Sequence, residues 1–403
     1  MSAAKDTVTQ AVDGIADELE ALSRRIHDHP ELAYQEKQAA GWLTEFLAGK
    51  GFKIESGVAG VETAFRATID TGMGPTIAIM CEYDALPGIG HACGHNVIAA
   101  SGAGAGAALA LSKDALPKGR IQVIGTPAEE GGGGKNRLIK GGIFKDVDCA
   151  MMIHGFDRTI LHQDLLGIVR GTFEFQGKAS HASADPWEGV NALDAVIQTF
   201  NNVSMLRQQM RPDARMHGIV TQGGAAPNII PEVAACTFYV RAAKLDYMWD
   251  LRKRVVACAA GAAQATGCTL TVIDFEAPYE PLKRNDTLLD LFRANMKTAG
   301  AVESPPLLDR MGSSDIGNVS QVIPAIQPMV QIAPPGTPIH SRAFEAAAVS
   351  TLARQGMCQA AKTMAMTTYD LLADPGLVKR ARSEFEATKR AASPSDSPNG
   401  GGA

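Results

Sequence analysis

The chain is long and weakly acidic, and it lacks the features that would tie it to nucleic acid or to a membrane. Its 403 residues are enough for two domains with separate cores. A formal net charge of −5 leaves no broad basic surface, which excludes nucleic acid as the main partner. The seven cysteines are an odd number and stand mostly in apolar runs, which favours a reducing compartment over a disulfide framework. We therefore expect a cytoplasmic protein without a signal peptide or a membrane segment.

Residues 1–164 and 283–390 are expected to form one catalytic domain of the α/β class, with a mixed sheet and helices on both faces. Hydrophobic spacing and turn signals predict its elements. In chain order these are helices 7–28 and 36–50, strands 62–70, 75–81, 121–125, 149–153 and 326–332, and helices 285–299, 344–372 and 377–389. The Thr-Gly-Met-Gly sequence at 71–74 predicts a hairpin between the first two strands.

Between these two parts, residues 165–282 follow a different rhythm. Their predicted elements are strand 168–176, helix 189–210, strands 216–222 and 233–241, helix 244–266, and strand 268–275. The order β-α-β-β-α-β is the split βαβ unit, which forms a compact ferredoxin-like sandwich by itself. We therefore predict an inserted domain at 165–282. Residues 391–403, rich in Ser, Pro and Gly, are predicted to be a disordered tail.

The sequence His-Ala-Cys-Gly-His-Asn at 91–96 holds two metal-binding side chains, Cys93 and His95, only two residues apart. Residues that share a helix face are three or four apart, so this pair cannot bind one ion from a regular helix. A tight turn can bring the thiolate and the imidazole to one ion, and Gly94 permits such a turn. The pair therefore indicates a candidate metal site.

Four apolar strands each lead to groups that can bind a metal or move a proton. In chain order these groups are Glu82 and Asp84, Glu129 and Glu130, His154, and His340. In open α/β sheets ligands bind outside the carboxyl ends of the strands, so we expect these groups to converge with Cys93 and His95.

Glu129 and Glu130 are adjacent carboxylates that repel each other, so a fold that buries both needs a cation. We predict that Glu130 binds the metal and that Glu129 is the general base beside it. Asp84 is expected to orient His95 from outside the ligand set. Glu82 is either a similar outer group or a strand-end acid whose partners lie within the fold.

Five motifs resemble the dinuclear metallopeptidases of the aminoacylase/carnosinase family. They are His-Pro-Glu-Leu at 29–32, Glu-Tyr-Asp-Ala-Leu-Pro at 82–87, the 91–96 motif, Gly-Thr-Pro-Ala-Glu-Glu at 125–130, and Gly-Lys-Ala-Ser-His-Ala at 177–182. Within that family the chain resembles the amidohydrolase branch. It is most similar to dipeptidases that cleave dipeptides ending in a basic residue and to aminobenzoyl-glutamate hydrolases.

This resemblance implies two divalent metal ions, Zn or Mn, with a cysteine between them. The implied ligands are Cys93, His95, Glu130, His154 and His340. It also implies that Glu129 is the base and that the inserted domain is a lid and a homodimerisation surface. In that arrangement His181 reaches the active site of the partner subunit, and Asn228 and Arg241 contact the substrate. The expected reaction is hydrolysis of an amide or peptide bond in a small substrate, a dipeptide or an N-acyl amino acid, by metal-activated water.

Two alternatives stay open. Cys93 could be the nucleophile of a cysteine hydrolase with His95 or His154 as base, which would leave the Glu129–Glu130 pair unexplained. The chain could also be a catalytically silent metal-binding homologue. Many relatives have Asp at the position of Asn96, Asp-X-Asp at 82–84 and Glu at the position of Ser314, so the substrate is not fixed by the motifs.

Overall fold

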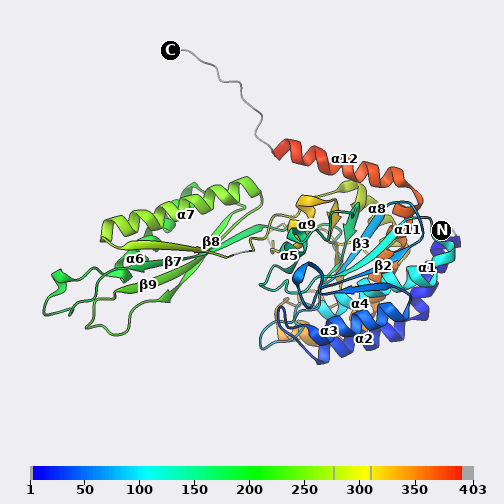
Figure 1. The fold of residues 1–403 in the computed structure, drawn as a ribbon, viewed down its shortest axis with the longest axis horizontal. Helices are drawn as coiled ribbons and strands as arrows, with labels where there is room; N and C mark the ends of the chain where they lie inside the picture. The colour runs from blue at the N-terminus through cyan, green and yellow to red at the C-terminus, as the bar shows by residue number, and fades with distance from the viewer. Residues whose placement is uncertain (1–2, 276, 309–310, 393–403) are drawn as a thin grey trace, which may run out of the picture. The chain divides into compact units, whose positions relative to one another are not determined.

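A computed structural model describes residues 3–275, 277–308 and 311–392 (Figure 1). The chain divides into two compact units. The first contains Met1–Gln163, Lys283–Met311 and Asn318–Ala403, and the second contains Asp164–Leu282 and Gly312–Gly317. Both combine helices with sheets, which confirms the predicted α/β fold class. The expected tail, residues 391–403, lies outside the described residues apart from its first two, which end the last helix.

The first unit is built on a six-stranded mixed sheet in the order β1-β2-β4-β3-β5-β11. The strands are β1 (Lys53–Ser56), β2 (Phe65–Asp70), β3 (Thr76–Cys81), β4 (Arg120–Gly125), β5 (Cys149–Met151) and β11 (Ala325–Ile326). The predicted hairpin at 71–74 is wrong, because β4 lies between β2 and β3. Every residue of β3 is buried, as expected for a central strand with a parallel partner on each side, here β4 and β5.

A second, two-stranded sheet pairs β6 (His154–Phe156) in parallel with β12 (Met329–Gln331). The predicted strand 326–332 is therefore two strands in two sheets, β11 and β12. Residues 327 and 328 separate them, and the second is a proline, which has no N–H to donate to a sheet.

Helices cover both faces of the six-stranded sheet (Figure 1). The helices of the first unit are α1 (Ala3–Gly14), α2 (Ala16–Asp28), α3 (Lys37–Gly49), α4 (His95–Leu111), α5 (Gly134–Lys140), α8 (Asp286–Thr298), α10 (Arg342–Ala347), α11 (Thr351–Ala373) and α12 (Pro375–Ala392). The short α9 (Ile316–Val322) crosses from the second unit into the first. Two predicted helices are each two helices in the structure: 7–28 corresponds to α1 and α2, and 344–372 corresponds to α10 and α11. Ser350 caps the start of α11, because its hydroxyl accepts the N–H of Ala353.

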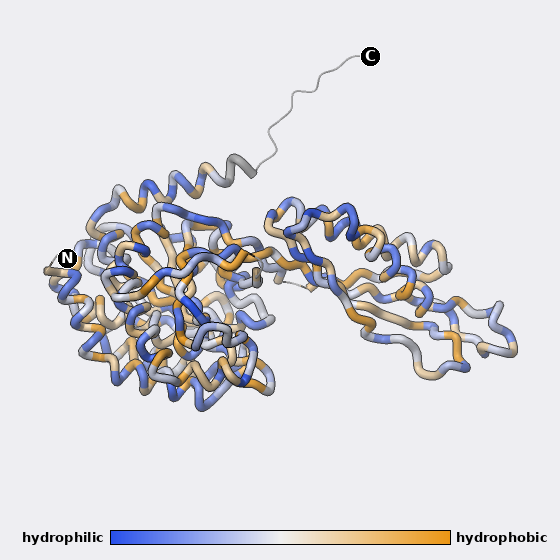
Figure 2. The backbone as a smooth tube through the Cα atoms, turned by 180° about the vertical axis from the view of Figure 1, so that it is seen from behind, coloured by the Kyte–Doolittle hydropathy of each residue, from blue (hydrophilic) through white to orange (hydrophobic). Residues whose placement is uncertain are grey.

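The helix α4 lies against β3 and β4, with α1, α2, α3 and α11 packed around it. It is rich in Gly and Ala, which lets it approach the sheet closely. A Cβ added at Gly102 would lie 2.6 Å from the Sγ of Cys81. By contrast α12 is amphipathic, and Figure 2 shows hydrophobic and hydrophilic residues alternating along it. Its buried residues Val378, Ala381 and Phe385 recur at helical spacing.

The second unit is a four-stranded antiparallel sheet in the order β10-β7-β9-β8. Its elements are β7 (Gly167–Gln176), α6 (Ala192–Leu206), β8 (Arg215–Gln222), β9 (Val233–Ala242), α7 (Leu245–Thr266) and β10 (Thr269–Asp274), which is the predicted β-α-β-β-α-β order. Both helices pack on one face of the sheet, where Phe173, Phe238, Val196 and Leu251 share a core. The opposite face carries the polar residues of the alternating pattern.

Within the described part of the chain, no helix is long and apolar enough to cross a membrane. All seven cysteines lie among the described residues and are free there.

Candidate metal centre

Parallel pairing aligns the carboxyl ends of three neighbouring strands of the first unit. Cys81, the last residue of β3, pairs with Gly125, the last residue of β4, and β5 runs parallel beside them. The segments that leave these ends carry Glu82 and Asp84, Glu129 and Glu130, and His154. These groups therefore lie where ligands bind in open α/β sheets, outside the carboxyl ends of the strands.

Cys93 and His95 stand on either side of a glycine that begins a helix. Gly94 has a φ of 77° and precedes α4, of which His95 is the first residue. The left-handed conformation is easy only for glycine, and a Cβ here would also lie 2.5 Å from the Cδ1 of Ile332. This turn brings the thiol and the imidazole to the same place, which a continuous helix could not do.

The donor atoms of the five predicted ligands converge in the first unit. The Sγ of Cys93 lies 3.4 Å from Nε2 of His154. Oε1 of Glu130 lies 3.8 Å from Nε2 of His95 and 3.5 Å from Nε2 of His340. Cys93 shares one group of mutually close donors with His95 and His154, and another with Glu130 and His340, all within 4.8 Å of one another in each group. These two overlapping groups, which share the thiol of Cys93, are compatible with two ions.

Hydrogen bonds behind the histidines turn their Nε2 atoms toward this centre. Nδ1 of His95 donates to Oδ1 of Asp84 at 3.1 Å, and Nδ1 of His154 donates to the carbonyl of Gly155 at 2.7 Å. Each ring therefore presents Nε2, the nitrogen that would bind a cation when the ion replaces any proton there. His340 is held differently. Its backbone N–H donates to the carbonyl of Ala92 at 2.8 Å, and its φ of 59° is rare for a residue with a side chain.

The donor set fits divalent cations. Three of the converging atoms, Nε2 of His95, Oε1 of Glu130 and Oε2 of Glu82, are buried and have no hydrogen-bond partner among the residues that the structure describes. Buried polar atoms are seldom left unpaired, because desolvation then has no compensation. Nitrogen, oxygen and sulfur ligands together are typical of zinc and of neighbouring divalent ions.

Electrostatics in the metal-free protein argue against a free cysteine nucleophile. Burial, followed by the negative charge of Glu130, raises the pKa of the Cys93 thiol well above its ordinary value. Reactive cysteines have lowered pKa values and lie in electropositive surroundings. Burial opposes a charged His95, but the carboxylate of Asp84 outweighs it and raises the pKa of the imidazole well above the usual value. A positive charge is thus favoured at this place, and a bare thiolate is not.

A buried lysine beside this centre was not predicted. Nζ of Lys135, in the first turn of α5, contacts Oε1 of Glu82 at 2.5 Å, and both side chains are completely buried. The other oxygen of Glu82 lies 3.6 Å from Nε2 of His95. Glu82 therefore joins the ligand cluster to Lys135, and the choice between its two expected roles stays a prediction. A lysine on a short polar helix is usually exposed, so the sequence offered no signal.

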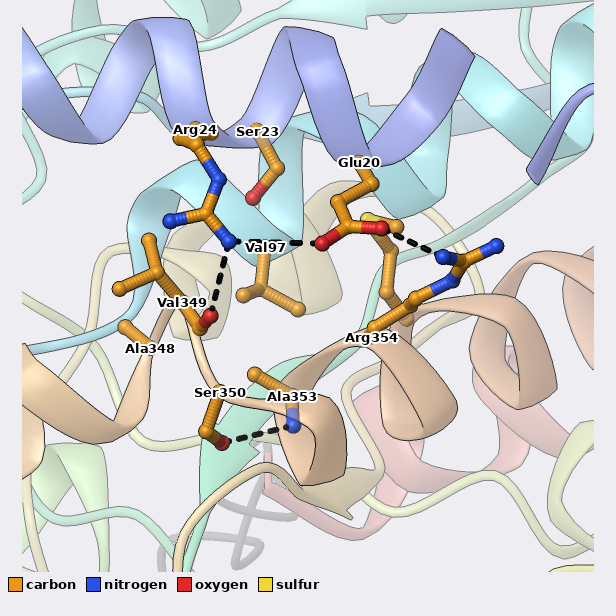
Figure 3. A pocket seen from close by; sticks show the side chains of 10 residues that line it. Glu20, Ser23, Arg24, Val97, Ala348, Val349, Ser350, Ala353 and Arg354 are labelled. Carbon is orange, nitrogen blue, oxygen red and sulfur yellow. Dashed lines mark hydrogen bonds and ion pairs between the residues drawn. The ribbon is translucent and has the colours of Figure 1, made fainter. Parts of the chain in front are cut away.

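Asn96 makes two hydrogen bonds through the NH₂ of its amide. Nδ2 of Asn96 donates to Oγ of Ser23 at 2.9 Å and to the carbonyl of Ala348 at 3.0 Å. A carboxylate could donate neither bond. Ser23 and Ala348 also line a small cavity between α2 and the start of α11 (Figure 3). Arg24 and Glu20 line the same cavity, which contains none of the predicted ligands.

The remaining predicted residues belong to the second unit. Nδ1 of His181 accepts the backbone N–H groups of Ser183 and Ala184, both at 3.2 Å. The carbonyl of Asn228 accepts the N–H of Ala182 at 3.0 Å, so His181 and Asn228 lie near each other. Arg241, on β9, donates to Oγ of Ser313 at 3.2 Å. The roles assigned to these three residues stay predictions.

A mixed sheet that carries nitrogen, oxygen and sulfur donors and a further acid at its carboxyl edge is typical of metal-dependent hydrolases. Comparison with known proteins agrees. The pattern of Peptidase family M20/M25/M40 matches residues 65–357. The Xaa-Arg dipeptidase of Mus musculus is 39% identical over 404 residues, covering 95% of this chain and 92% of the mouse protein.

Two further relatives are more distant. One of the subunits of the p-aminobenzoyl-glutamate hydrolase of Escherichia coli K12 is 28% identical over 443 residues, covering 91% of each chain. A solved structure from Bacillus subtilis, described as a dinuclear metal binding peptidase from the M20 family, has the same fold. Its TM-score is 0.71 at 21% identity, over 90% of this chain and 99% of the other. The chain belongs to the M20/M25/M40 peptidase family.

This membership confirms the resemblance inferred from the motifs and the prediction that the chain is a hydrolase acting on C–N bonds. Metal-dependent hydrolysis of an amide or peptide bond is the reaction that the family supports. The individual ligands, the base and the substrate stay predictions.

Proposed function

We propose that the protein hydrolyses the amide bond of small dipeptides or N-acyl amino acids, with dipeptides that end in a basic residue as the first substrates to test. The convergence of Cys93, His95, Glu130, His154 and His340 in two overlapping groups of donors, in which Cys93 and His95 are buried and His340 is exposed, carries this proposal. The identity to Xaa-Arg dipeptidases over nearly the whole chain supports the choice of substrate. Aminobenzoyl-glutamate is the second candidate, supported by the bacterial relative.

The five ligands would hold two divalent ions, with Cys93 shared between them. Such ions acidify a water molecule and polarise the carbonyl that it attacks. Zinc suits the thiolate and the imidazoles, while manganese is compatible with the group that contains the carboxylate of Glu130. Glu130 reaches both His95 and His340, which supports its role as a ligand.

Glu129 is the proposed general base. Its carboxylate lies within 4.8 Å of donor atoms of His95 and Glu130, with Oε2 4.0 Å from Nε2 of His95, and the residue is 6% exposed. In the proposed reaction this carboxylate accepts a proton from the attacking water as the new C–O bond forms. It then returns the proton to the nitrogen as the C–N bond breaks, so that an amine and a carboxylate leave the site.

His181, Asn228 and Arg241 are proposed to complete the site from the second unit. By the resemblance, His181 would act in the active site of a partner subunit, which requires a homodimer. The strand β8 supports this assembly, since it is an edge of its sheet and exposes Ile219 and Val220, 67% and 49% accessible. Burial of such an edge against a second copy would remove the exposed apolar surface. Light scattering on the purified protein tests the dimer.

The substrate panel that tests this function contains β-alanyl-arginine, alanyl-arginine, alanyl-glutamate, aminobenzoyl-glutamate and N-acetyl-methionine, read by released amine. The protein is assayed as purified, after chelation, and after return of Zn²⁺ or Mn²⁺ alone. We expect turnover of at least one substrate, loss on chelation, and recovery with one of the ions. Activity that survives chelation would point to the cysteine mechanism. No turnover with metal bound would favour a silent homologue.

A further inference from the structure

Glu36 is a buried carboxylate outside the ligand cluster that the mechanism above does not use. It precedes α3, and its side chain is inaccessible to solvent. Oε1 accepts two backbone N–H groups at 2.9 Å, one from Tyr34 and one from Ala128. Oε2 accepts the hydroxyl of Thr63, also at 2.9 Å. The contacts to Ala128 and Thr63 join segments that are far apart in the sequence.

Both residues whose N–H groups Glu36 accepts have left-handed backbones. The φ of Tyr34 is 63° and the φ of Ala128 is 62°. This conformation costs free energy for residues with a Cβ and persists only where the surroundings impose it. Ala128 immediately precedes Glu129 and Glu130, so its backbone sets the direction in which the base and a ligand leave the end of β4.

Tyr34 also contacts the far end of the loop formed by residues 126–132, which follows β4. Its hydroxyl donates to the carbonyl of Gly132 at 2.6 Å, and the guanidinium of Arg137 lies 4.3 Å from the centre of its ring. On the sheet side, Oδ2 of Asp84 accepts the N–H of Glu130 at 2.9 Å. The Glu129–Glu130 pair is therefore bounded by hydrogen bonds at positions 128, 130 and 132.

We propose that Glu36 is a positioning residue for the reaction, because its hydrogen bond to the N–H of Ala128 holds the strained turn that aims Glu129 and Glu130. The inference rests on the proposed function for its catalytic consequence, but the turn itself can be measured without activity. Burial, together with the negative charge of Asp84, raises the pKa of Glu36 to about 7. Either protonation state preserves the contacts, since the Thr63 hydroxyl can rotate to donate or to accept.

Two substitutions separate the acceptor geometry from the charge. Glu36→Gln keeps the length of the side chain and an oxygen for both N–H groups but removes the charge. Glu36→Asp keeps the charge but withdraws the carboxylate by one methylene, out of reach of Ala128. Glu31→Asp is the matched control, because Glu31 accepts the N–H groups of Gln38 and Ala39 at the start of α3, away from the 126–132 loop.

The first readout is hydrogen exchange of the peptide 126–132 in the metal-free protein. The second is kcat and KM of the two-metal enzyme on the best substrate of the panel. We expect Glu36→Asp to speed exchange in that peptide and, at saturating metal, to lower kcat by about 100-fold with KM little changed. Glu36→Gln and Glu31→Asp should match the wild type within about threefold in both readouts, since each leaves the acceptor at the loop in place.

Unchanged exchange and kcat in Glu36→Asp would overturn the proposal. So would a Glu36→Gln protein as impaired as Glu36→Asp, because the charge and not the hydrogen bond would then matter. If the wild type hydrolyses no substrate of the panel, the proposed function fails, and the exchange data alone still decide whether Glu36 holds the turn.

Discussion

The carboxylate of Asp84 contacts two of the predicted metal ligands. Its Oδ1 accepts Nδ1–H of His95 at 3.1 Å, and its Oδ2 accepts the backbone N–H of Glu130 at 2.9 Å. Burial alone would raise its pKa, but the imidazole of His95 outweighs burial and the net pKa is lowered. Asp84 therefore stays ionised and orients both groups at once.

We expect Asp84→Asn to weaken metal binding by about 10- to 100-fold, as is usual when a group behind a ligand is removed. The amide must turn its NH₂ toward one of the two donors, which leaves either His95 or Glu130 misdirected. Competition with a chromophoric chelator measures the affinity. An unchanged dissociation constant for both ions would show that Asp84 does not orient the ligands.

The role of Glu129 predicts a separation between binding and turnover. Glu129→Gln should keep both ions and lose turnover by about 10²- to 10⁴-fold, the range of general base catalysis. Glu130→Gln is the control and should lose metal as well as activity. Elemental analysis alongside kcat distinguishes the two variants. Normal turnover in Glu129→Gln would exclude it as the base.

The buried pair Lys135–Glu82 predicts a strong asymmetry between single and double variants. Lys135→Met leaves an uncompensated carboxylate in the core, which should lower the free energy of unfolding by about 3–5 kcal/mol. Adding Glu82→Gln removes that charge, so the double variant should recover much of the loss. Urea denaturation of the metal-free proteins measures both. Equal stability of the single variant and the wild type would contradict a desolvated pair.

The raised pKa of Glu36 predicts a pH-dependent stability. Its folded pKa of about 7 lies above the ordinary value of 4.5, so the folded state binds more protons between these pH values. The free energy of unfolding should therefore fall as pH rises from about 4.5 to about 7. The loss is up to roughly 3 kcal/mol for a shift of this size. Glu36→Gln should lack this component, and parallel pH profiles of the two proteins would refute the assignment.

Sequence reasoning succeeded where local pattern and topology agree. Apolar runs that end in Glu82, Glu129 and His154 could be assigned to one sheet edge, because parallel strands bring their carboxyl ends together. The turn at Gly94 could also be predicted from the sequence, because two ligands only two residues apart cannot bind one ion from a regular helix. Both inferences depend on neighbours in the chain or on a general rule of sheets.

Contacts between segments that are distant in the chain could not be predicted from the sequence. The link at 71–74 has the composition of a hairpin, and nothing in it reveals that β4 lies between β2 and β3. Lys135 and Glu36 look like ordinary surface residues of helix starts, because their burial depends on segments 53 and 92 positions away. A pattern within one helix cannot report such partners.

Anomalous diffraction from crystals of the purified protein, recorded on both sides of the zinc and manganese absorption edges, tests the central claim most directly. We predict two anomalous peaks per chain on either side of the Cys93 sulfur, one beside His95 and His154 and the other beside Glu130 and His340. Density without a peak among these side chains in fully metal-loaded protein, or peaks elsewhere in the molecule, would contradict the account.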